Sequence, residues 1–157
     1  MGLEIERKYT VNNLIFERLK KLATGVDIRQ GYLNTAPERT VRVRTKGEKG
    51  YLTIKGKTVG IERAEFEYEI PHSDALALLE LCEPYLIEKT RYTFSENNMI
   101  WELDVFEGIH KGLIIAELEL DDKDKIFNLP DWIDKEVSEN PIYYNSALSK
   151  NPWIEQQ

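Results

Sequence analysis

Valine and arginine alternate along the stretch Thr40-Val41-Arg42-Val43-Arg44-Thr45. In an extended chain every second side chain points to the same face, so the arginines share one face and the valines share the other. Lys46 extends the basic row by one more position. The pattern therefore predicts a β-strand over residues 39–46 with one apolar face and one basic face.

Charged and apolar residues alternate in the same way along several other stretches, and each charged row keeps one sign. The acidic rows are Glu4 and Glu6, Glu65 to Glu69, Glu102 and Asp104, and Glu117 and Glu119; a second basic row is Lys89 and Arg91. A single strand of this kind is typical of a sheet with one solvated face. Uncharged polar residues are almost absent from these rows, however, although a solvated face tolerates them. We therefore expect the charged faces to meet inside a closed or nearly closed barrel.

The remaining signals indicate an α+β fold, an antiparallel β-sheet or barrel flanked by helices. Strands are expected near 3–11, 27–34, 39–46, 50–56, 62–70, 87–96, 99–107 and 113–121. One helix should begin at Asn12 or Asn13 and end near Ala23, and a second should run over 74–83, capped by Ser73 and ended by Pro84. Turns are expected at 46–50 and at Asn97-Asn98. The last 35 residues are mixed, with packing anchors expected at Trp132, Tyr143, Tyr144 and Trp153.

Composition places limits on the partners of the chain. The 157 residues include 21 lysines and arginines and 28 acidic residues, a formal net charge of −7. We expect one domain over residues 1–157, and the acidic balance argues against nucleic-acid binding. No apolar run approaches a membrane span and no signal peptide is visible. The single Cys82, expected in a buried helical position, indicates a reducing, cytoplasmic setting. His72 and His110 are expected in surface turns, which argues against a zinc site.

A barrel interior lined with both signs is costly unless a ligand completes it. The basic side chains that need an anion are Lys8, Arg42, Arg44, Lys55, Lys89 and Arg91. The clustered carboxylates need cations, and oxygen ligands suit a hard divalent ion such as Mg²⁺ or Mn²⁺. A linear polyphosphate with a bound divalent metal meets both demands, because arginine binds phosphate oxygens bidentately.

The same residues resemble the CYTH family, also called triphosphate tunnel metalloenzymes. Its opening signature E-x-E-x-K corresponds to Glu4-Ile5-Glu6-Arg7-Lys8, and later segments follow in family order over about residues 3–150. Those segments are Gln30 to Leu33, Arg42 to Arg44, Thr53 to Lys55, Glu65 to Glu67, Glu88 to Tyr92, Glu102 to Phe106, Glu117 to Glu119 and Tyr143 to Leu148.

The resemblance implies an eight-stranded antiparallel β-barrel that forms a tunnel for a small polyanionic triphosphate, with a divalent metal required. It implies triphosphate binding by Arg42, Arg44, Lys55, Lys89 and Arg91. It implies metal binding by Glu4, Glu6, Glu117 and Glu119, and further acidic tunnel positions at Glu65, Glu67 and Asp104. Lys8 and Tyr32 match a pair associated with activation of the attacking water.

We therefore expect a metal-dependent hydrolase of inorganic triphosphate or a related organic triphosphate, with Mg²⁺ or Mn²⁺ as cofactor. The alternatives are a class IV-type adenylate cyclase, a nucleoside or thiamine triphosphatase, and a non-catalytic polyphosphate- or nucleotide-binding module. The expected assembly is a monomer or a homodimer. The sequence does not indicate which triphosphate is preferred, or whether the C-terminal segment closes one end of the tunnel.

Overall fold

The alternating stretches form long strands in the computed structural model, which describes residues 2–22 and 24–153. The strands are β1 (Gly2–Val11), β2 (Val26–Asn34), β3 (Arg39–Lys46), β4 (Lys49–Gly56), β5 (Glu62–Ile70), β6 (Glu83–Glu96), β7 (Met99–Phe106), β8 (Ile114–Glu119) and β9 (Ile133–Glu136). The helices are α1 (Ile15–Leu19), α2 (His72–Leu79) and α3 (Asn145–Leu148), with 3-10 turns η1 (Gly108–His110) and η2 (Pro141–Tyr143).

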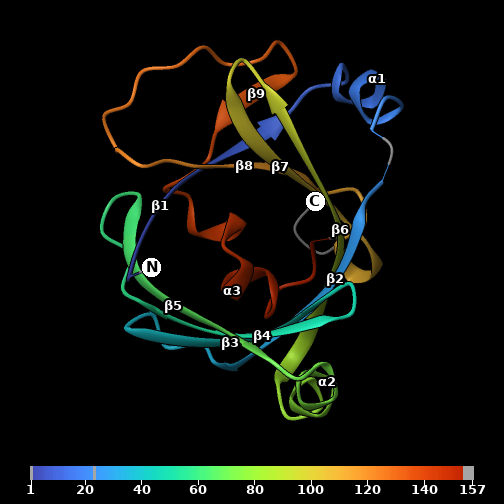
Figure 1. The fold of residues 1–157 in the computed structure, drawn as a ribbon, viewed down its shortest axis with the longest axis vertical. Helices are drawn as coiled ribbons and strands as arrows, with labels where there is room; N and C mark the ends of the chain where they lie inside the picture. Colours follow the sequence, from blue (N-terminus) through green and yellow to red (C-terminus); the bar gives the residue numbers. More distant parts are fainter. Residues whose placement is uncertain (1, 23, 154–157) are drawn as a thin grey trace.

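The strands β1 to β8 close into the antiparallel eight-stranded barrel that the sequence indicated (Figure 1). Neighbours around the ring follow the order β5, β4, β3, β2, β6, β7, β8, β1, and the ring closes where Gly2 to Ile5 of β1 pair with β5. The opposite edge of β1 pairs with β8, opposing Lys8 to Glu117. The sequence did not predict the short β9. It pairs with Tyr9 and Val11 of β1, on the same edge of β1 that pairs with β5.

Local signals account for the turns better than for the helices. Asn97 and Asn98 both adopt positive φ, as a two-residue hairpin turn between β6 and β7 requires. The expected helix over 12–23 is shorter, covering Ile15–Leu19, and its expected end at Ala23 lies outside the described residues. The expected cap at Ser73 is wrong, because α2 begins at His72, directly after Pro71. Cys82 is half-buried in the turn that follows α2 and precedes β6.

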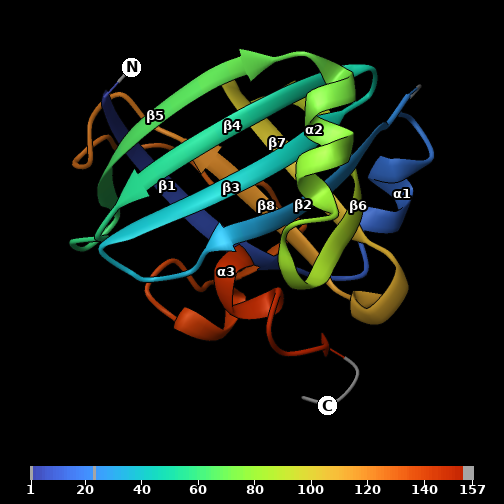
Figure 2. The same ribbon diagram turned by 90° about the horizontal axis from the view of Figure 1, so that it is seen from below.

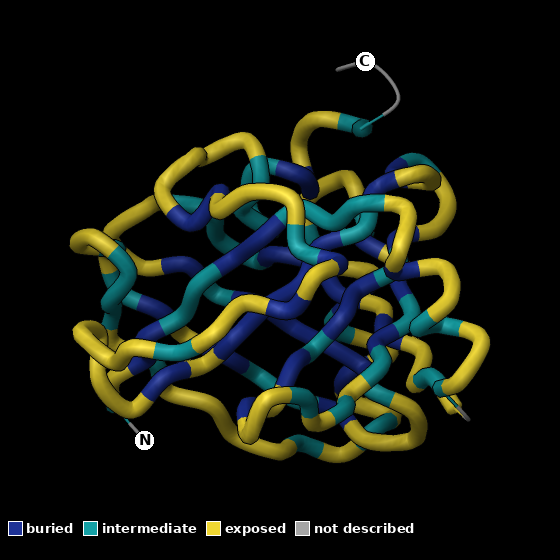
Figure 3. Tube along the Cα trace, turned by 90° about the horizontal axis from the view of Figure 1, so that it is seen from above, coloured by how far each residue is buried: buried dark blue, intermediate teal, exposed yellow. Residues whose placement is uncertain are grey.

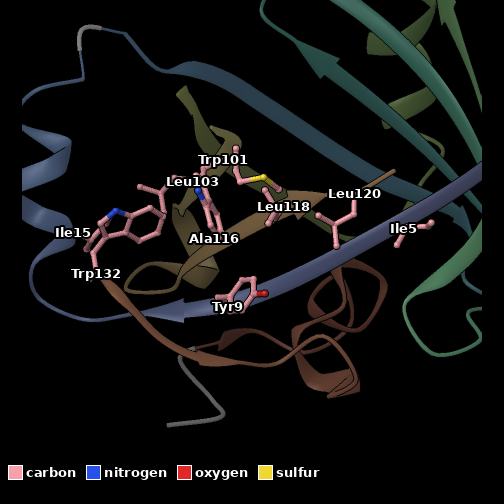
Figure 4. Close-up of a cluster of buried hydrophobic side chains, with 10 residues drawn as sticks. Ile5, Tyr9, Ile15, Trp101, Leu103, Ala116, Leu118, Leu120 and Trp132 are labelled. Carbon is pink, nitrogen blue, oxygen red and sulfur yellow. The ribbon is translucent and has the colours of Figure 1, made fainter. Parts of the chain in front are cut away.

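The largest apolar cluster lies outside the barrel, over β1, β7 and β8 (Figure 4). Trp101 and Leu118 point outward from their strands because Glu102 and Glu117 point inward. Trp132, an expected packing anchor, is 1% exposed, and its ring lies 5.3 Å from that of Trp101 in an edge-on arrangement. Each large aromatic removed from water stabilises the fold by roughly 1.5–3 kcal/mol, so this cluster holds the barrel wall from outside.

A second cluster lies under α2, where Ala75 and Leu79 pack on Val43 of β3. Gly50 permits this contact, since a Cβ at that position would lie 2.6 Å from the Cβ of Ala75. The outer face of β4 and β5 is less covered, and Phe66 and Tyr68 are 42% and 50% exposed. Figure 3 shows buried segments concentrated along the barrel strands and exposed ones in the connecting loops.

A third cluster closes one end of the barrel. Ile87, Phe106 and Ile115 pack with Leu148 of α3. They lie two positions from Lys89, Asp104 and Glu117 and therefore share the inward face. Residues 141–153, named the plug here, lie across this end, and α3 appears inside the ring in Figure 1 and beyond the strands in Figure 2.

His110 anchors the C-terminal end of the plug, and the expected surface position for it is wrong. It is fully buried beside Phe106, and its Nδ1 accepts a hydrogen bond of 3.0 Å from the backbone N–H of Trp153. The backbone N–H of Tyr85 also donates to the carbonyl of Ser149.

Across the described residues, no helix has the length and apolar character that crossing a membrane would require.

Candidate functional site

The charged rows meet inside the barrel and line a cavity of about 210 Å³, named the tunnel cavity here. Among the residues that the structure describes, seven of its lining side chains are lysine or arginine and seven are glutamate. The described lining residues are Glu4, Glu6, Lys8, Arg42, Arg44, Lys46, Tyr51, Lys55, Arg63, Glu65, Glu67, Arg91, Glu102, Glu117, Glu119 and Asn145. Glu67 and Glu119 are also exposed, so the cavity reaches solvent on their side.

Arg44 is a buried base on the wall of the tunnel cavity, and among the described residues it has no ion-pair partner. Its side chain is buried, and its Nε donates a 2.8 Å hydrogen bond to the neutral Gln30. No carboxylate in the described ranges lies within ion-pairing distance of it. Burial and the neighbouring Arg42 and Arg91 lower the pKa of Arg44 to about 9. The charges of Asp104 and Glu117 offset this lowering only in part, and an anionic ligand in the cavity would stabilise the charged form further.

The opposite side of the cavity holds Glu4 between two bases. Its carboxylate accepts hydrogen bonds of 2.9 and 3.0 Å from Lys55 and one of 3.3 Å from Arg63. Burial opposes ionisation of Glu4, but the charge of Lys55, hydrogen bonds with Glu65 and Lys55, and the charge of Arg63 outweigh it and hold its pKa at about 2. Burial and a hydrogen bond with Glu4 raise the pKa of Glu65 to about 7.

Glu6 carries a carboxylate whose negative charge is opposed by its surroundings. Burial, together with the charges of Glu117 and Glu4, raises its pKa to about 8. Its nearest base is Lys8, whose Nζ lies 3.7 Å from Glu6 and 3.5 Å from Glu117. At neutral pH this environment favours either a proton or a metal ion at Glu6.

The carboxylates do not form a complete metal cage by themselves. Within residues 2–22 and 24–153, no group of three or more histidine, cysteine, aspartate or glutamate side chains is positioned to hold a metal ion. Glu4 and Glu117 are instead bonded to bases. Magnesium is commonly held by one or two carboxylates together with waters and substrate phosphates. The oxygen donors here fit such a shared site, which phosphate oxygens would complete.

Lys89 and Asp104 lie behind the cavity wall, where they form a buried network with Arg91. Lys89 Nζ donates to Asp104 at 2.7 Å, and Arg91 donates two further hydrogen bonds to that carboxylate at 2.7 and 2.8 Å. Burial lowers the pKa of Lys89 to about 7, against the pull of Asp104. Burial also opposes ionisation of Asp104, but Lys89 and Arg91 outweigh it and hold its pKa below the usual value.

Lys8 and Tyr32 line a smaller cavity of about 40 Å³ at the plugged end. This inner cavity shares Glu4, Glu6, Lys8, Arg63 and Asn145 with the tunnel cavity. Burial opposes the charge on Lys8, but Glu117 and Glu6 raise its pKa above the usual value. The ammonium group is therefore a hydrogen-bond donor at neutral pH, suited to orienting a water molecule rather than removing its proton.

The structure brings together the residues that the sequence singled out. Those lining the tunnel cavity are Glu4, Glu6, Lys8, Arg42, Arg44, Lys55, Glu65, Glu67, Arg91, Glu117 and Glu119; Tyr32 lines the inner cavity, and Lys89 and Asp104 support the wall. Sequence reasoning missed Arg63, which shares the face of Glu65 by the same alternation. It also missed Gln30 and Asn145 as contacts, and no charge pattern marks either residue.

Comparisons with known proteins agree with this geometry. The CYTH domain family matches residues 2–152. A protein named inorganic triphosphatase from Acetivibrio thermocellus is 49% identical over 154 residues, covering 98% of this chain and 97% of that protein. Another of that name, from Nitrosomonas europaea, is 34% identical over 93% of this chain and 96% of its own length. The crystal structure of the inorganic triphosphatase NE1496 aligns with a TM-score of 0.64 at 31% identity, covering 96% of this chain and 97% of that one.

Proposed function

The chain belongs to the CYTH domain family, and we propose that it is an inorganic triphosphatase that hydrolyses the terminal phosphoanhydride of tripolyphosphate. The observation that carries this proposal is the buried Arg44, which lies near the like charges of Arg42 and Arg91 and has no ion-paired carboxylate among the described side chains. A linear triphosphate supplies the several negative charges that these guanidinium groups need, in a shape that follows a tunnel.

The basic side chains hold the substrate extended and neutralise its oxygens. Phosphoryl transfer proceeds through a loose transition state, so positioning and charge stabilisation do most of the catalytic work. Arg42 and Arg44 on β3 face Arg91 on β6, which allows contacts to the chain from two sides. Lys55 is paired with Glu4 and Glu65 in the free protein, at 2.9 and 3.1 Å, and would exchange one of them for a phosphate oxygen.

The attacking water belongs in the inner cavity beside Lys8 and Tyr32. Its oxygen forms a bond to the terminal phosphorus while the bond from that phosphorus to the bridging oxygen breaks, releasing orthophosphate and pyrophosphate. Because Lys8 is held as an ammonium, Lys8 and Tyr32 orient the water, and its proton passes to a phosphate oxygen. A water at the plugged end lies opposite the pyrophosphate, which faces the open end of the tunnel.

The proposal includes a divalent metal ion, Mg²⁺ or Mn²⁺, held by Glu4, Glu6, Glu117 and Glu119 together with phosphate oxygens. When bound, such an ion neutralises negative charge on the transferring phosphate. Support comes from the oxygen-only donor set and from the raised pKa of Glu6, whose charge is opposed by burial, Glu117 and Glu4. A chelator should abolish hydrolysis, and added Mg²⁺ or Mn²⁺ should restore it.

A substrate panel tests this function. Purified protein is incubated with tripolyphosphate, ATP, thiamine triphosphate or pyrophosphate, each with and without Mg²⁺ and Mn²⁺, and orthophosphate and cAMP are measured. We expect metal-dependent orthophosphate release that is fastest with tripolyphosphate. Cyclic AMP from ATP would instead establish a cyclase. Tight calorimetric binding of tripolyphosphate without phosphate release would establish a binding module.

Arg44→Ala tests the role of the buried guanidinium, and Arg29→Ala is its matched control. Arg29 is exposed on β2, and its side chain forms a surface ion pair of 3.7 Å with Glu88. We expect Arg44→Ala to weaken tripolyphosphate binding in calorimetry and Arg29→Ala to leave it unchanged. Equal binding by all three proteins would show that the buried guanidinium does not recognise the substrate.

A further inference from the structure

The plug contributes one polar side chain to both cavities, that of Asn145 at the start of α3. Its Oδ1 accepts a 3.2 Å hydrogen bond from Gln30 Nε2 and a 3.4 Å hydrogen bond from Lys89 Nζ. Gln30 in turn accepts the hydrogen bond from Arg44. The Asn145 amide is therefore held by Gln30 of β2 and Lys89 of β6, next to the basic side chains of the tunnel.

These contacts fix which end of the amide faces the cavity. Both partners of the Oδ1 atom are donors, and a side-chain amide can accept only through its oxygen. The Nδ2 group must then point elsewhere, and none of the described residues accepts a hydrogen bond from it. Since Asn145 lines the tunnel and inner cavities, its two N–H donors are available to an anionic ligand there.

We propose that Asn145 is a catalytic residue that donates an Nδ2 hydrogen bond to an oxygen of the terminal phosphoryl group during its transfer. This inference rests on the proposed function, because it assigns the contact to the phosphate that is attacked. The inner cavity places Asn145 with Lys8 and Tyr32, so the phosphate nearest the oriented water is also the phosphate nearest this amide. The plug then completes the active site in addition to closing the tunnel.

The aspartate variant separates substrate contact from a structural role. In Asn145→Asp, carboxylate oxygens can still accept from Gln30 and Lys89, so the plug should stay docked. The variant loses the N–H donors, however, and adds a negative charge beside the phosphate. If Asn145 only positions Lys89 and Gln30, Asn145→Asp should keep near-normal kcat/KM. If it contacts the substrate, Asn145→Asp should lose at least as much as Asn145→Ala.

We expect kcat/KM for tripolyphosphate to fall about 10- to 100-fold in Asn145→Ala, the loss of one hydrogen bond to a charged group. The matched control is Asn140→Ala, which removes another asparagine from the same C-terminal segment. Asn140 is exposed and lines neither cavity, and its Oδ1 accepts a 3.3 Å hydrogen bond from the backbone N–H of Ile142. It should keep normal activity. An equal loss in Asn140→Ala, or normal activity in Asn145→Asp, would overturn the assignment.

Thermal unfolding of the variants and calorimetry complete the test. An Asn145→Ala protein with an unchanged Tm and reduced kcat/KM supports direct contact, whereas a lowered Tm with recovery of activity at lower temperature would indicate a structural role. If the wild-type protein binds tripolyphosphate without hydrolysing it, the proposed function fails. Calorimetry alone then tests the role of Asn145. Weaker tripolyphosphate binding in Asn145→Ala would mean that Asn145 contacts the ligand without a catalytic role, and unchanged binding would mean that it does not contact the ligand.

Discussion

Two walls of the tunnel carry the same types of residue but pair their charges differently. On the wall formed by β6, β7 and β8, Asp104 is fully buried and accepts three short hydrogen bonds from Lys89 and Arg91. On the wall formed by β3, β4 and β5, the acids reach solvent, and the side chain of Glu67 is 38% exposed where it meets Arg42 at 3.3 Å. On the first wall Lys89 and Asp104 are paired away from solvent, whereas on the second wall Glu67 is open to solvent and Arg42 can exchange it for a ligand.

The difference separates two kinds of ion pair in this barrel. Where base and acid are both fully buried, as Lys89 and Asp104 are, breaking the pair leaves an uncompensated charge. Where one partner is exposed, the pair contributes little to stability and the base is available for binding. Removing one partner on the first wall should therefore lower the free energy of unfolding, and removing the base of a pair on the second wall should lower activity.

Asp104→Asn should have the largest effect. It leaves Lys89 and Arg91 buried beside a neutral amide, and breaking such a pair costs about 3–5 kcal/mol. The free energy of unfolding from urea denaturation measures this loss. Glu102→Gln is the matched control on the same strand, because Glu102 is 28% exposed and bonds only one nitrogen of Arg91. A loss below about 1 kcal/mol in Asp104→Asn would mean that this wall is not the more tightly paired one.

Arg42→Ala should affect activity and leave stability nearly intact. We expect kcat/KM for tripolyphosphate to fall at least ~100-fold, which corresponds to ~2.7 kcal/mol at the transition state. The free energy of unfolding should change little, because removing Arg42 also removes a like charge beside the buried Arg44. Arg39→Ala, an exposed position on the same strand, should retain normal activity. A large loss of unfolding free energy in Arg42→Ala, with normal kcat/KM for the protein that remains folded, would contradict the assignment of this wall to binding.

The pH dependence of stability should also differ between the walls. Because the pKa of Asp104 is lowered by folding, despite burial, its contribution to stability is fully present above the unfolded-state pKa near 3.8 and is lost as pH falls through the lower folded-state value. Denaturation curves collected at several pH values around and below 3.8 should show this loss in the wild-type protein. The slope should be shallower in Asp104→Asn, and identical slopes would show that Asp104 does not titrate as proposed.

Glu67→Gln should have the smallest effect. Glu67 accepts hydrogen bonds from Thr53 at 2.8 Å and from Arg42 at 3.3 Å, and an amide oxygen can still accept both. We expect the free energy of unfolding to stay within about 0.5 kcal/mol of wild type and KM to change by less than about threefold. Steady-state kinetics and urea denaturation measure both quantities. A loss as large as that of Arg42→Ala would show that the open wall is as strongly coupled as the buried one.

The alternation of residue types predicted the eight barrel strands and most of the tunnel lining. Arg42 and Arg44 face inward because Val43 faces outward, and the same rule places Glu65 and Glu117. The rule also covers Arg63, which precedes the acidic row by two positions. The helices were predicted less well, because a helix of five residues such as α1 is stabilised by packing rather than by its own pattern.

The roles of Gln30 and Asn145 could not be predicted from residue pattern. Both are neutral amides, and the 115 positions between them are bridged only when β2 and the plug meet at one end of the barrel. The position of His110 has the same origin. A turn residue is normally exposed, but the plug covers this one and donates the Trp153 N–H to it.

The sequence alone determined which strand side chains face the tunnel, because strand periodicity is a local property that each stretch of alternating residues carries by itself. Only the tertiary structure decided which charges pair with each other, which end of the barrel the plug closes, and which amide it places beside Lys8 and Tyr32. Those contacts join residues far apart in the chain, so their geometry depends on how the ring closes and on the packing of Leu148 and Trp153 against its inner end.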